Sequence, residues 1–502
     1  MSSPADSASS SRRSHESLDQ FYARLRERSD REDLVMFINA GCAATQQGEY
    51  YAGVCEQSVS IEFLHQYVLA NYRRLYARTL AAGINHFHQA LIIANLLAAG
   101  APSDAAQRAE EGTLIAAALR RLPANRAYGL LANLARRRIN NRRTRAIIKS
   151  YLRSRREPQF DAVKYRRKYR TTAAHAHLNL GEQLGADFGD FLFQMKKSAR
   201  YQTPLFEQYR RGHYSAQAIY DLPYTVAESL AQKHGVPRDV FLQKIEPKLT
   251  ALERLRLQSS ADRAGGVELD FDLGRAPLTR LALFVLSLPI AERRERGVEL
   301  HEALQRSAKR ALERVPLQLG RVAAVLDRSR STFGSREKRR RPLAVALAAS
   351  YLFRAASAEY RAIWTPAHDD GQWEFTMPAV GQTDLAEPLL DAFEWQPEMI
   401  LIVSDGYEND PPGAVDQVAQ VFQKRLAAGA GPEIVHFNPV FDSHHFAPRT
   451  LGQTIATVGL RDAEDAGTML GFARFVCGAG TLQELEDYLA VRVQRMLERH
   501  ET

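Results

Sequence analysis

The spacing of apolar residues changes near residue 320, and this change divides the chain into two kinds of structure. Before it, stretches such as 61–81 (IEFLHQYVLANYRRLYARTLA) carry apolar residues three and four positions apart, which is typical of amphipathic helices. After it, short apolar runs such as 399–403 (MILIV) alternate with helical stretches. Strands that are buried on both faces and separated by helices predict a doubly wound, mostly parallel α/β sheet. We therefore expect a mainly α protein in which an α-helical solenoid precedes an α/β domain.

Turn residues and shifts in composition divide the chain into five segments. The first is polar, has no apolar run that would mark a signal peptide, and is expected to be disordered. No strict repeat is visible in the helical segment, so its repeats would be diverged, and whether it closes into a ring is left open. The expected segments are a disordered tail at 1–15, a HEAT-like helical repeat domain at 16–257, a linker at 258–277, connecting helices at 278–317 and a Rossmann-like α/β domain at 318–502.

Two local expectations within these segments are specific enough to be tested by a structure. Residues 178–199 are expected to form one helix. Residues 358–365 (AEYRAIWT) and 372–378 (QWEFTMP) are expected to pair as the two strands of a hairpin.

Composition limits the class of protein. The longest apolar runs, such as 90–101, are too short to span a bilayer, and the three cysteines form no CxxC motif. We therefore expect a cytoplasmic protein with reduced thiols, without a membrane partner, and a monomer. The formal net charge is +9, which is a weak indication of polyanionic partners until its distribution is considered.

Oxygen-bearing side chains follow two of the predicted strands. Asp327, Ser329 and Ser331 come directly after one apolar run, and Asp405 follows another, while Thr383 begins a predicted helix between them. Carboxylates and hydroxyls are ligands that hard cations prefer, so the set predicts a site for Mg²⁺, with Mn²⁺ or Ca²⁺ as alternatives. The simpler alternative is that Asp327, Ser329 and Asp405 only cap the turns that follow them.

Basic residues are concentrated in one part of the helical segment. Between Arg136 and Arg170 there are fifteen Lys or Arg residues and only two acidic residues, Glu157 and Asp161. Arginine binds phosphate in a bidentate manner, and the interleaved Tyr151, Tyr165 and Tyr169 could stack on bases, although helical spacing is equally consistent with core tyrosines. The candidate RNA-binding residues are Arg136, Arg137, Arg138, Arg142, Arg143, Arg145, Lys149, Arg153, Lys164, Arg166, Arg167, Lys168, Arg170, His175 and His177. The alternative is a solvated basic helix surface.

The five oxygen-bearing residues resemble the metal-ion-dependent adhesion site (MIDAS) of the von Willebrand factor A (vWA) domain, which has Asp-x-Ser-x-Ser, a later Thr and an Asp in Ser-Asp-Gly. The resemblance implies that Ser329, Ser331 and Thr383 contact the metal directly, and that Asp327 and Asp405 hold it, often through water. Arg330 departs from the pattern, since the family usually has Gly there.

The rest of the chain resembles the TROVE module of the Ro ribonucleoprotein family. The similar stretches are 38–57 (INAGCAATQQGEYYAGVCEQ), 131–152, 164–180, 222–235 and the closing segment 458–489. The resemblance implies a helical ring closed by a vWA domain, which binds single-stranded ends of noncoding RNA in its hole and Y-like RNA on its outer surface.

Two functions are compatible with these patterns. The first is a non-enzymatic RNA-binding ribonucleoprotein, since no nucleophile–base pair or two-metal carboxylate cage is evident. Its partners would be noncoding RNA and RNA-processing proteins, with an acidic group at the metal site. The alternative is a vWA adaptor that docks through its metal site on a MoxR-type AAA+ ATPase.

Overall fold

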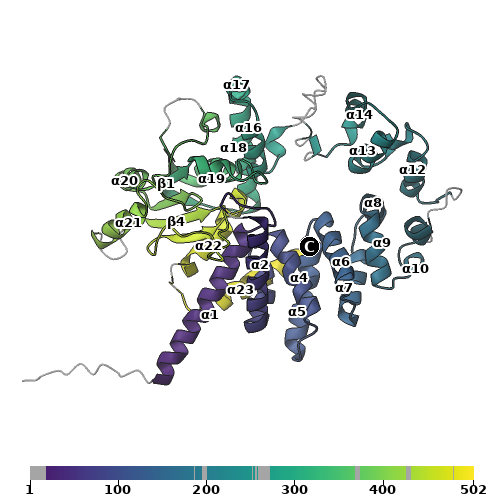
Figure 1. Cartoon of the computed structure of the whole chain (residues 1–502), viewed down its shortest axis with the longest axis horizontal. Coiled ribbons are helices and arrows are strands. Elements are labelled where there is room, and N and C mark those ends of the chain that lie inside the picture. Colours follow the sequence, from purple (N-terminus) through teal and green to yellow (C-terminus); the bar gives the residue numbers. More distant parts are fainter. Residues whose placement is uncertain are drawn as a thin grey trace, which may run out of the picture.

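The protein is described from a computed structural model of the whole chain (Figure 1). The expected disordered tail at 1–15 and most of the expected linker at 258–277 lie outside the described residues. These comprise 18–51, 53–185, 187–194, 200–250, 253–254, 257, 272–367, 373–425, 431–476, 478 and 480–501.

The N-terminal part is an array of short helices, as expected from the three- and four-residue spacing of its apolar residues. In the array, α4 packs on α6 and α6 on α9, while α5 packs on α3 and α7, so two layers of helices run side by side (Figure 1). The bounds are α1 (Leu18–Ala43), α2 (Val54–Asn71), α3 (Arg73–Arg78), α4 (His86–Ala98), α5 (Ala105–Arg121), α6 (Ala124–Arg136), α7 (Arg142–Arg153), α8 (Pro158–Lys164), α9 (Arg166–His175), α10 (Leu180–Leu184), α11 (Asp187–Gly189), α12 (Pro204–Gly212), α13 (Tyr224–Lys233) and α14 (Arg238–Ile245).

Polar residues in the turns start several of these helices. Asn85 accepts hydrogen bonds from the backbone N–H groups of Phe87 and His88, and Asp104 accepts one from Gln107. Asn141 accepts one from Thr144. Each cap satisfies a backbone donor that the first turn of a helix leaves without a partner.

The C-terminal part contains a parallel sheet with helices on both faces. Its helices are α16 (Leu278–Ser287), α17 (Ile290–Glu295), α18 (Gly297–Arg314), α19 (Arg341–Ala356), α20 (Ala386–Glu394), α21 (Ala414–Arg425), α22 (Ala466–Val476) and α23 (Leu482–Glu501). Its strands are β1 (Leu319–Asp327), β2 (Ser357–Thr365), β3 (Met399–Val403), β4 (Glu433–Asn438) and β5 (Ala456–Gly459).

Within the described residues the strand order is β2-β1-β3-β4-β5, and every pairing is parallel. The chain moves outward from β1 to β2 and then returns to place β3 on the other side of β1. The order therefore reverses between β1 and β3, which is where sheets of this kind leave a crevice beyond the strand ends.

Alternate residues of β1 point into two different cores. Val322, Ala324 and Leu326 belong to the buried cluster that includes α16, α18 and α19. Ala323 and Val325 belong to a second cluster, which includes α20 and α21. This division explains why β1 is apolar without alternation, since side chains of successive strand residues face opposite sides of the sheet.

The expected hairpin is wrong. Residues 357–365 form the parallel strand β2 beside β1, and Glu374–Thr376 form a short 3-10 helix. Helix α19 ends at Ala356 and carries the chain back to the start of the sheet, so the next strand runs parallel to β1. Trp373 and Phe375 stack on each other, with ring centroids 5.8 Å apart, and Phe375 is fully buried. Core packing rather than strand pairing thus accounts for these apolar residues.

The expected single helix at 178–199 is broken. Gly185 has φ +117°, a conformation that ends α10, and the chain restarts as α11 and a π-helical turn at Asp190–Gln194. Residues 195–199 of this stretch lie outside the described residues.

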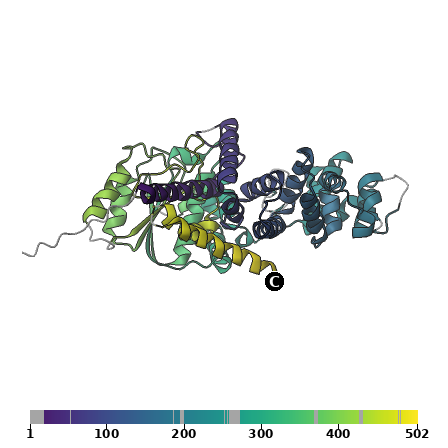
Figure 2. The same ribbon diagram turned by 90° about the horizontal axis from the view of Figure 1, so that it is seen from below.

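The long first helix covers the edge strand of the sheet. The Asn39 side chain on α1 donates to the Thr457 carbonyl (3.0 Å) and accepts from the Gly459 N–H (3.2 Å), as a neighbouring strand would. A Cβ on Gly459 would lie 2.6 Å from the Asn39 carbonyl oxygen, so the close approach requires glycine. Helices α1 and α23 both lie along this part of the domain (Figure 2).

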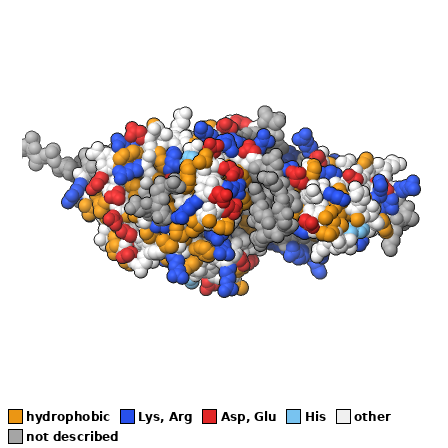
Figure 3. All heavy atoms as spheres, turned by 90° about the horizontal axis from the view of Figure 1, so that it is seen from above, with side chains coloured by type: hydrophobic (Ala, Val, Ile, Leu, Met, Phe, Trp, Pro, Cys, Tyr) orange, Lys and Arg blue, Asp and Glu red, His pale blue; other side chains and the backbone are white. Residues whose placement is uncertain are grey.

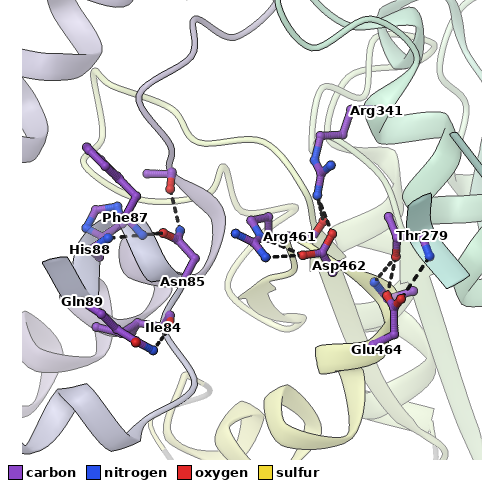
Figure 4. Close-up of polar contacts among 12 residues, drawn as sticks. Ile84, Asn85, Phe87, His88, Gln89, Thr279, Arg341, Arg461, Asp462 and Glu464 are labelled. Carbon is purple, nitrogen blue, oxygen red and sulfur yellow. Dashed lines mark hydrogen bonds and ion pairs between the residues drawn. The ribbon is translucent and has the colours of Figure 1, made fainter. Parts of the chain in front are cut away.

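A group of polar contacts joins α16 and α19 to the segment that follows β5 (Figure 4). Thr279 on α16 donates to Glu464 (2.6 Å) and accepts from the Ala463 N–H. Arg341 at the start of α19 donates to the Asp462 carboxylate (2.7 Å). These bonds fix the segment after β5, from which α22 and α23 continue toward the N-terminal helices.

Within the described residues, no helix has the length and apolar character needed to cross a membrane.

We expect Asn39→Ala to destabilise the joint between α1 and β5. The change leaves a buried N–H and a buried carbonyl without partners, at a cost of about 1–3 kcal/mol for each. Urea unfolding followed by tryptophan fluorescence measures this, since Trp364, Trp373 and Trp395 are the three tryptophans of the chain. Asn71→Ala, on the exposed end of α2, is the matched control and should have little effect.

A buried pair of histidines links α2 to α4. His65 Nε2 lies 2.8 Å from His88 Nδ1, and His65 Nδ1 lies 2.7 Å from the Tyr76 hydroxyl. Burial lowers the pKa of His88 to about 3, and burial together with His88 lowers that of His65. Both rings are therefore neutral in the folded protein at neutral pH.

These pKa values predict acid destabilisation below pH 6.5. In that range the unfolded chain binds protons that the folded protein does not, so stability is full above pH 6.5 and falls as the pH is lowered toward about 3. The loss is about 1.4 kcal/mol per histidine and pH unit. Urea unfolding followed by circular dichroism at several pH values should show a shallower pH dependence for His88→Gln. An identical slope in the wild type would contradict the assignment.

Candidate functional site

Four of the five predicted metal ligands meet beyond the carboxyl ends of β1 and β3. Asp327 is the last residue of β1, Ser329 and Ser331 follow in the next loop, and Asp405 comes shortly after β3. These loops lie where the strand order reverses. The Asp327 and Asp405 side chains are 0% and 1% exposed, so a pair of carboxylates is buried at this edge.

Asp327 is held in place by both of its oxygens. Its Oδ1 accepts from the Ser329 N–H (2.7 Å), and its Oδ2 accepts from the Ser404 hydroxyl (2.8 Å). Ser404 also accepts from the Gly406 N–H, so the two loops are connected through one hydroxyl. Gly406 has φ +79°, and a Cβ there would lie 2.6 Å from the Arg449 carbonyl oxygen, so the Ser-Asp-Gly turn requires glycine.

The serines lie between the two carboxylates. The Ser329 and Ser331 hydroxyl oxygens are 3.1 Å apart, and the Ser331 hydroxyl interacts electrostatically with the Asp405 carboxylate. One oxygen of Asp405, Oδ1, accepts from the Tyr407 N–H (3.1 Å). The other, Oδ2, is buried and has no hydrogen-bond partner among the described residues.

Thr383 is buried at 1% exposure and is positioned by the loop that follows Asp405. Its N–H donates to the Asn409 side chain (2.8 Å), and its carbonyl accepts from the N–H groups of Asn409 and Asp410. In the described part of the chain, no hydrogen bond joins Thr383 to the other four predicted ligands. The 405–410 loop therefore positions Thr383, and the residues just before it are joined to the segment after β1, since the Arg330 N–H donates to the Gly381 carbonyl (3.1 Å).

The side chains between the predicted ligands have a structural role. Arg328 is almost fully buried and donates to the carbonyls of Pro366, Ala367 and Pro378, which joins two described segments between β2 and Thr383. Arg330, which departs from the vWA pattern, is exposed.

Two buried carboxylates without a cation repel each other. Burial and the charge of Asp405 raise the pKa of Asp327 to about 7, and burial raises the pKa of Asp405. Capping of turns explains one oxygen of each carboxylate but leaves Asp405 Oδ2 unexplained. Among the described residues, no group of three or more acidic, His or Cys side chains could hold a metal, so hydroxyls would have to complete this donor set. Such a set suits a hard cation such as Mg²⁺.

The sequence did not identify Tyr51 as part of this site. Its hydroxyl lies near enough to Ser331 to interact with it, and its ring lies against that of Tyr407, with centroids 3.7 Å apart. The guanidinium carbon of Arg449 lies over the Tyr407 ring, 4.3 Å from its centroid. The only signal in the sequence was the Tyr50-Tyr51 pair within the stretch similar to TROVE.

The loop before Tyr51 is anchored to the segment after the serines. Glu49 and Lys338 form a buried ion pair. The Gly48 N–H donates to the Glu337 carboxylate (3.0 Å), and the Gly48 carbonyl accepts from the Ser335 hydroxyl (2.7 Å). A segment of the helical array is therefore fixed beside the carboxylate cluster.

The predicted RNA-binding arginines and lysines lie on α6 to α9 and in the turns between them. Among the described residues, several are exposed and form no hydrogen bond or ion pair through their side chains. They are Arg136, Arg138, Arg142, Arg145, Arg153, Arg167, Lys168 and Arg170. Lys149 is half-buried. By contrast, basic and acidic side chains are mixed on the face of the sheet domain that Figure 3 shows.

Other predicted RNA contacts are engaged within the protein. Arg143 pairs with buried Glu111 (2.6 Å), and Lys164 lies 3.9 Å from Glu253. Arg166 donates to the Phe191 carbonyl (2.7 Å).

Three more of the predicted RNA-binding residues form contacts around the turn before α7. Arg137 donates weakly to Asn95 (3.5 Å), and the His175 ring nitrogen lies 2.8 Å from the Ile139 carbonyl. The exposed His177 lies 3.3 Å from the Asn140 amide. These side chains help hold the array together.

The tyrosines expected as stacking platforms are mostly core residues. Tyr151 and Tyr169 are 2% and 0% exposed, and their rings pack on Tyr128, as does the half-buried Tyr165. The helical spacing that separates Tyr from Arg places the rings inside and the guanidinium groups outside. Of the two interpretations left open by the sequence, core packing therefore holds for Tyr151 and Tyr169.

Comparison with known proteins agrees with this architecture. No family model matches the chain, and no curated protein matches it in sequence. Among solved structures, the crystal structure of the Deinococcus radiodurans Ro (RSR) protein matches with a TM-score of 0.50, covering 90% of this chain and 100% of that one. The chain has the fold of a Ro protein. The sequence identity is 17%, so the likeness to the Ro fold concerns architecture alone.

We expect Asp405→Asn to stabilise the metal-free protein, because it removes one of two buried like charges. The gain in EDTA should be about 1–2 kcal/mol, measured by urea unfolding and tryptophan fluorescence. Mg²⁺ at a hundredfold excess over Kd should stabilise the wild type by about 2.7 kcal/mol and the variant far less. Asp391→Asn, at an exposed carboxylate on α20, is the control. Equal responses to Mg²⁺ in all three proteins would exclude a metal at Asp405.

Proposed function

We propose that this protein is a non-catalytic RNA-binding protein that uses the basic surface of α6 to α9. The observation that carries the proposal is the group of exposed basic side chains on these helices that have no partner in the described part of the chain. Ion pairs within a protein would compete with phosphate for such groups, whereas unpaired guanidinium groups are available to bind it. The Ro fold of the chain supports the same proposal.

The arrangement favours recognition of the RNA backbone. Arginine and lysine neutralise phosphates irrespective of base sequence, and the counterions that they release make the affinity strongly dependent on salt. Since the nearby tyrosines are buried, stacking on bases would contribute little at Tyr151 and Tyr169. We therefore propose noncoding RNA, selected by shape and by single-stranded ends, as the partner.

A second part of the proposal concerns the carboxylate cluster. Asp327, Ser329, Ser331, Thr383 and Asp405 would hold Mg²⁺, and Asp405 Oδ2 is the buried atom that lacks another partner. The ion would supply a Lewis-acidic position for an anionic oxygen from a partner, either a carboxylate or an RNA phosphate. The chain's own residues bind and orient that group, and we propose no chemical step.

The carboxylate cluster also favours a second candidate, an adaptor that docks on an acidic side chain of an AAA+ ATPase. RNA binding through α6 to α9 does not require a metal site, so the cluster calls for a ligand of its own. The two candidates predict different effects of the same substitution in the carboxylate cluster. Asp327→Ala should retain most of the RNA affinity under the first, because α6 to α9 supply it, and should abolish ATPase binding under the second.

Charge reversal on the basic surface tests RNA binding. The triple variant Arg138→Glu, Arg142→Glu and Arg145→Glu should bind a structured noncoding RNA with a single-stranded 3′ end at least tenfold more weakly. Its salt dependence, measured by fluorescence anisotropy, should become shallower by about 0.7–0.9 in log–log slope for each phosphate that the variant no longer neutralises. The three substitutions should not alter folding, because all three side chains are exposed.

The matched control carries the same change in net charge at exposed positions on the other part of the chain, with Arg280→Glu, Lys309→Glu and Lys424→Glu. It should retain most of its affinity. Equal decreases in affinity in both triple variants would mean that only net charge matters, and no decrease in either would reject α6 to α9 as the RNA surface.

A further inference from the structure

We propose that Tyr51 covers the carboxylate cluster and that an anionic ligand must displace its hydroxyl to reach the metal. The inference rests on the proposed metal site. It goes beyond that site because a residue of the helical array would control access to a site in the sheet domain. Three observations carry it: the position of the Tyr51 hydroxyl, the stacking of its ring and the anchoring of its loop.

The Tyr51 hydroxyl lies at one of the predicted ligands. It lies within interaction distance of Ser331 and of the Asp405 carboxylate. As a phenol, it carries no charge at physiological pH. A neutral hydroxyl can lie beside two carboxylates, but it is a poor substitute for a carboxylate or phosphate oxygen at a divalent cation.

The ring of Tyr51 packs against two other tyrosine rings. It lies against Tyr407, which follows Asp405 by two residues, and Tyr50 packs edge-on against it, with centroids 4.7 Å apart. Tyr51 nevertheless remains 43% exposed, and Tyr50 46%. An exposed aromatic ring over a buried polar cluster can move without opening a core, so the cover is attached by a small number of contacts.

The loop limits how far Tyr51 can move. Glu49 is fixed by its buried ion pair with Lys338, and Gly48 is bonded to Ser335 and Glu337. Beyond Tyr51, α2 begins at Val54 with Gly53 as its first flanking residue. Glu49 therefore restrains Tyr51 from its N-terminal side, and α2 belongs to the array that carries the basic surface.

Acidic side chains and RNA phosphates present the same chemistry to this site, namely an anionic oxygen. Acetate is a suitable probe for it, because it is small enough to test access without contacting the basic helices. With Mn²⁺ in the site, the relaxation rate of water protons reports on water at the ion, and acetate that replaces this water lowers the rate.

The experiment compares Tyr51→Phe and Tyr51→Ala with the wild-type protein loaded with Mn²⁺. Removal of the hydroxyl alone should tighten acetate binding about fivefold, which is the effect of one hydrogen bond, and removal of the ring should tighten it further. Mn²⁺ affinity, measured separately by electron paramagnetic resonance, should change less than about twofold, because the metal ligands themselves are unchanged. Tyr50→Phe is the matched control, since it removes a hydroxyl from the adjacent tyrosine, and it should bind acetate as the wild type does.

A second measurement does not depend on variants. Hydrogen exchange at the Gly48 amide, which donates to Glu337, should remain slow when acetate is added to the Mn²⁺-loaded protein, while exchange at residues 53 and 54 should accelerate. Acetate affinity that is equal in wild type, Tyr51→Phe and Tyr51→Ala would overturn the cover while leaving the metal site intact. A wild-type protein that binds no Mn²⁺ would reject the metal site itself.

Discussion

The arrangement of the whole chain depends on covering the exposed edge of the parallel sheet. Among the described strands, β5 has no strand on its outer side, and an uncovered edge is a template for unwanted pairing. Asn39 on α1 satisfies two of its backbone groups, and Gly459 allows the helix to approach. Because α1 leads directly into the loop with Glu49 and Tyr51, the same docking places that loop beside the ends of β1 and β3.

The candidate site shows how a fold can maintain an unfavourable pair of charges. Asp327 and Asp405 are both buried, and burial together with mutual repulsion favours a proton on one of them in the absence of a cation. Hydroxyls from Ser329, Ser331 and Ser404 compensate part of this cost but carry no positive charge. A bound cation would remove the conflict, and it would also satisfy the Asp405 oxygen that has no hydrogen-bond partner among the described residues.

The helical array separates two kinds of residue that alternate in its sequence. Along α7 and α9 the tyrosines turn inward around Tyr128, and most of the arginines turn outward. A periodicity near 3.6 residues is enough to produce this division, but it does not say which face is covered by the next helix. The burial of Tyr151 and Tyr169 was decided by the packing of α6 on α9, and the pairing of Arg143 with Glu111 by the position of α5.

The sequence by itself determined the helical array and the parallel sheet, because apolar periodicity reports directly on which faces are buried. The likeness to the Ro fold was indicated by the resemblance of stretches such as 38–57 and 458–489 to that family. It also brought Asp327, Ser329, Ser331 and Asp405 to one edge, since residues after parallel strands share that edge. It did not determine the path of residues 372–378, where aromatic side chains pack without forming a strand, or the break at Gly185. Only the tertiary structure placed Tyr51 on Ser331, because that contact joins residues far apart in sequence, and local pattern contains no information about such distances.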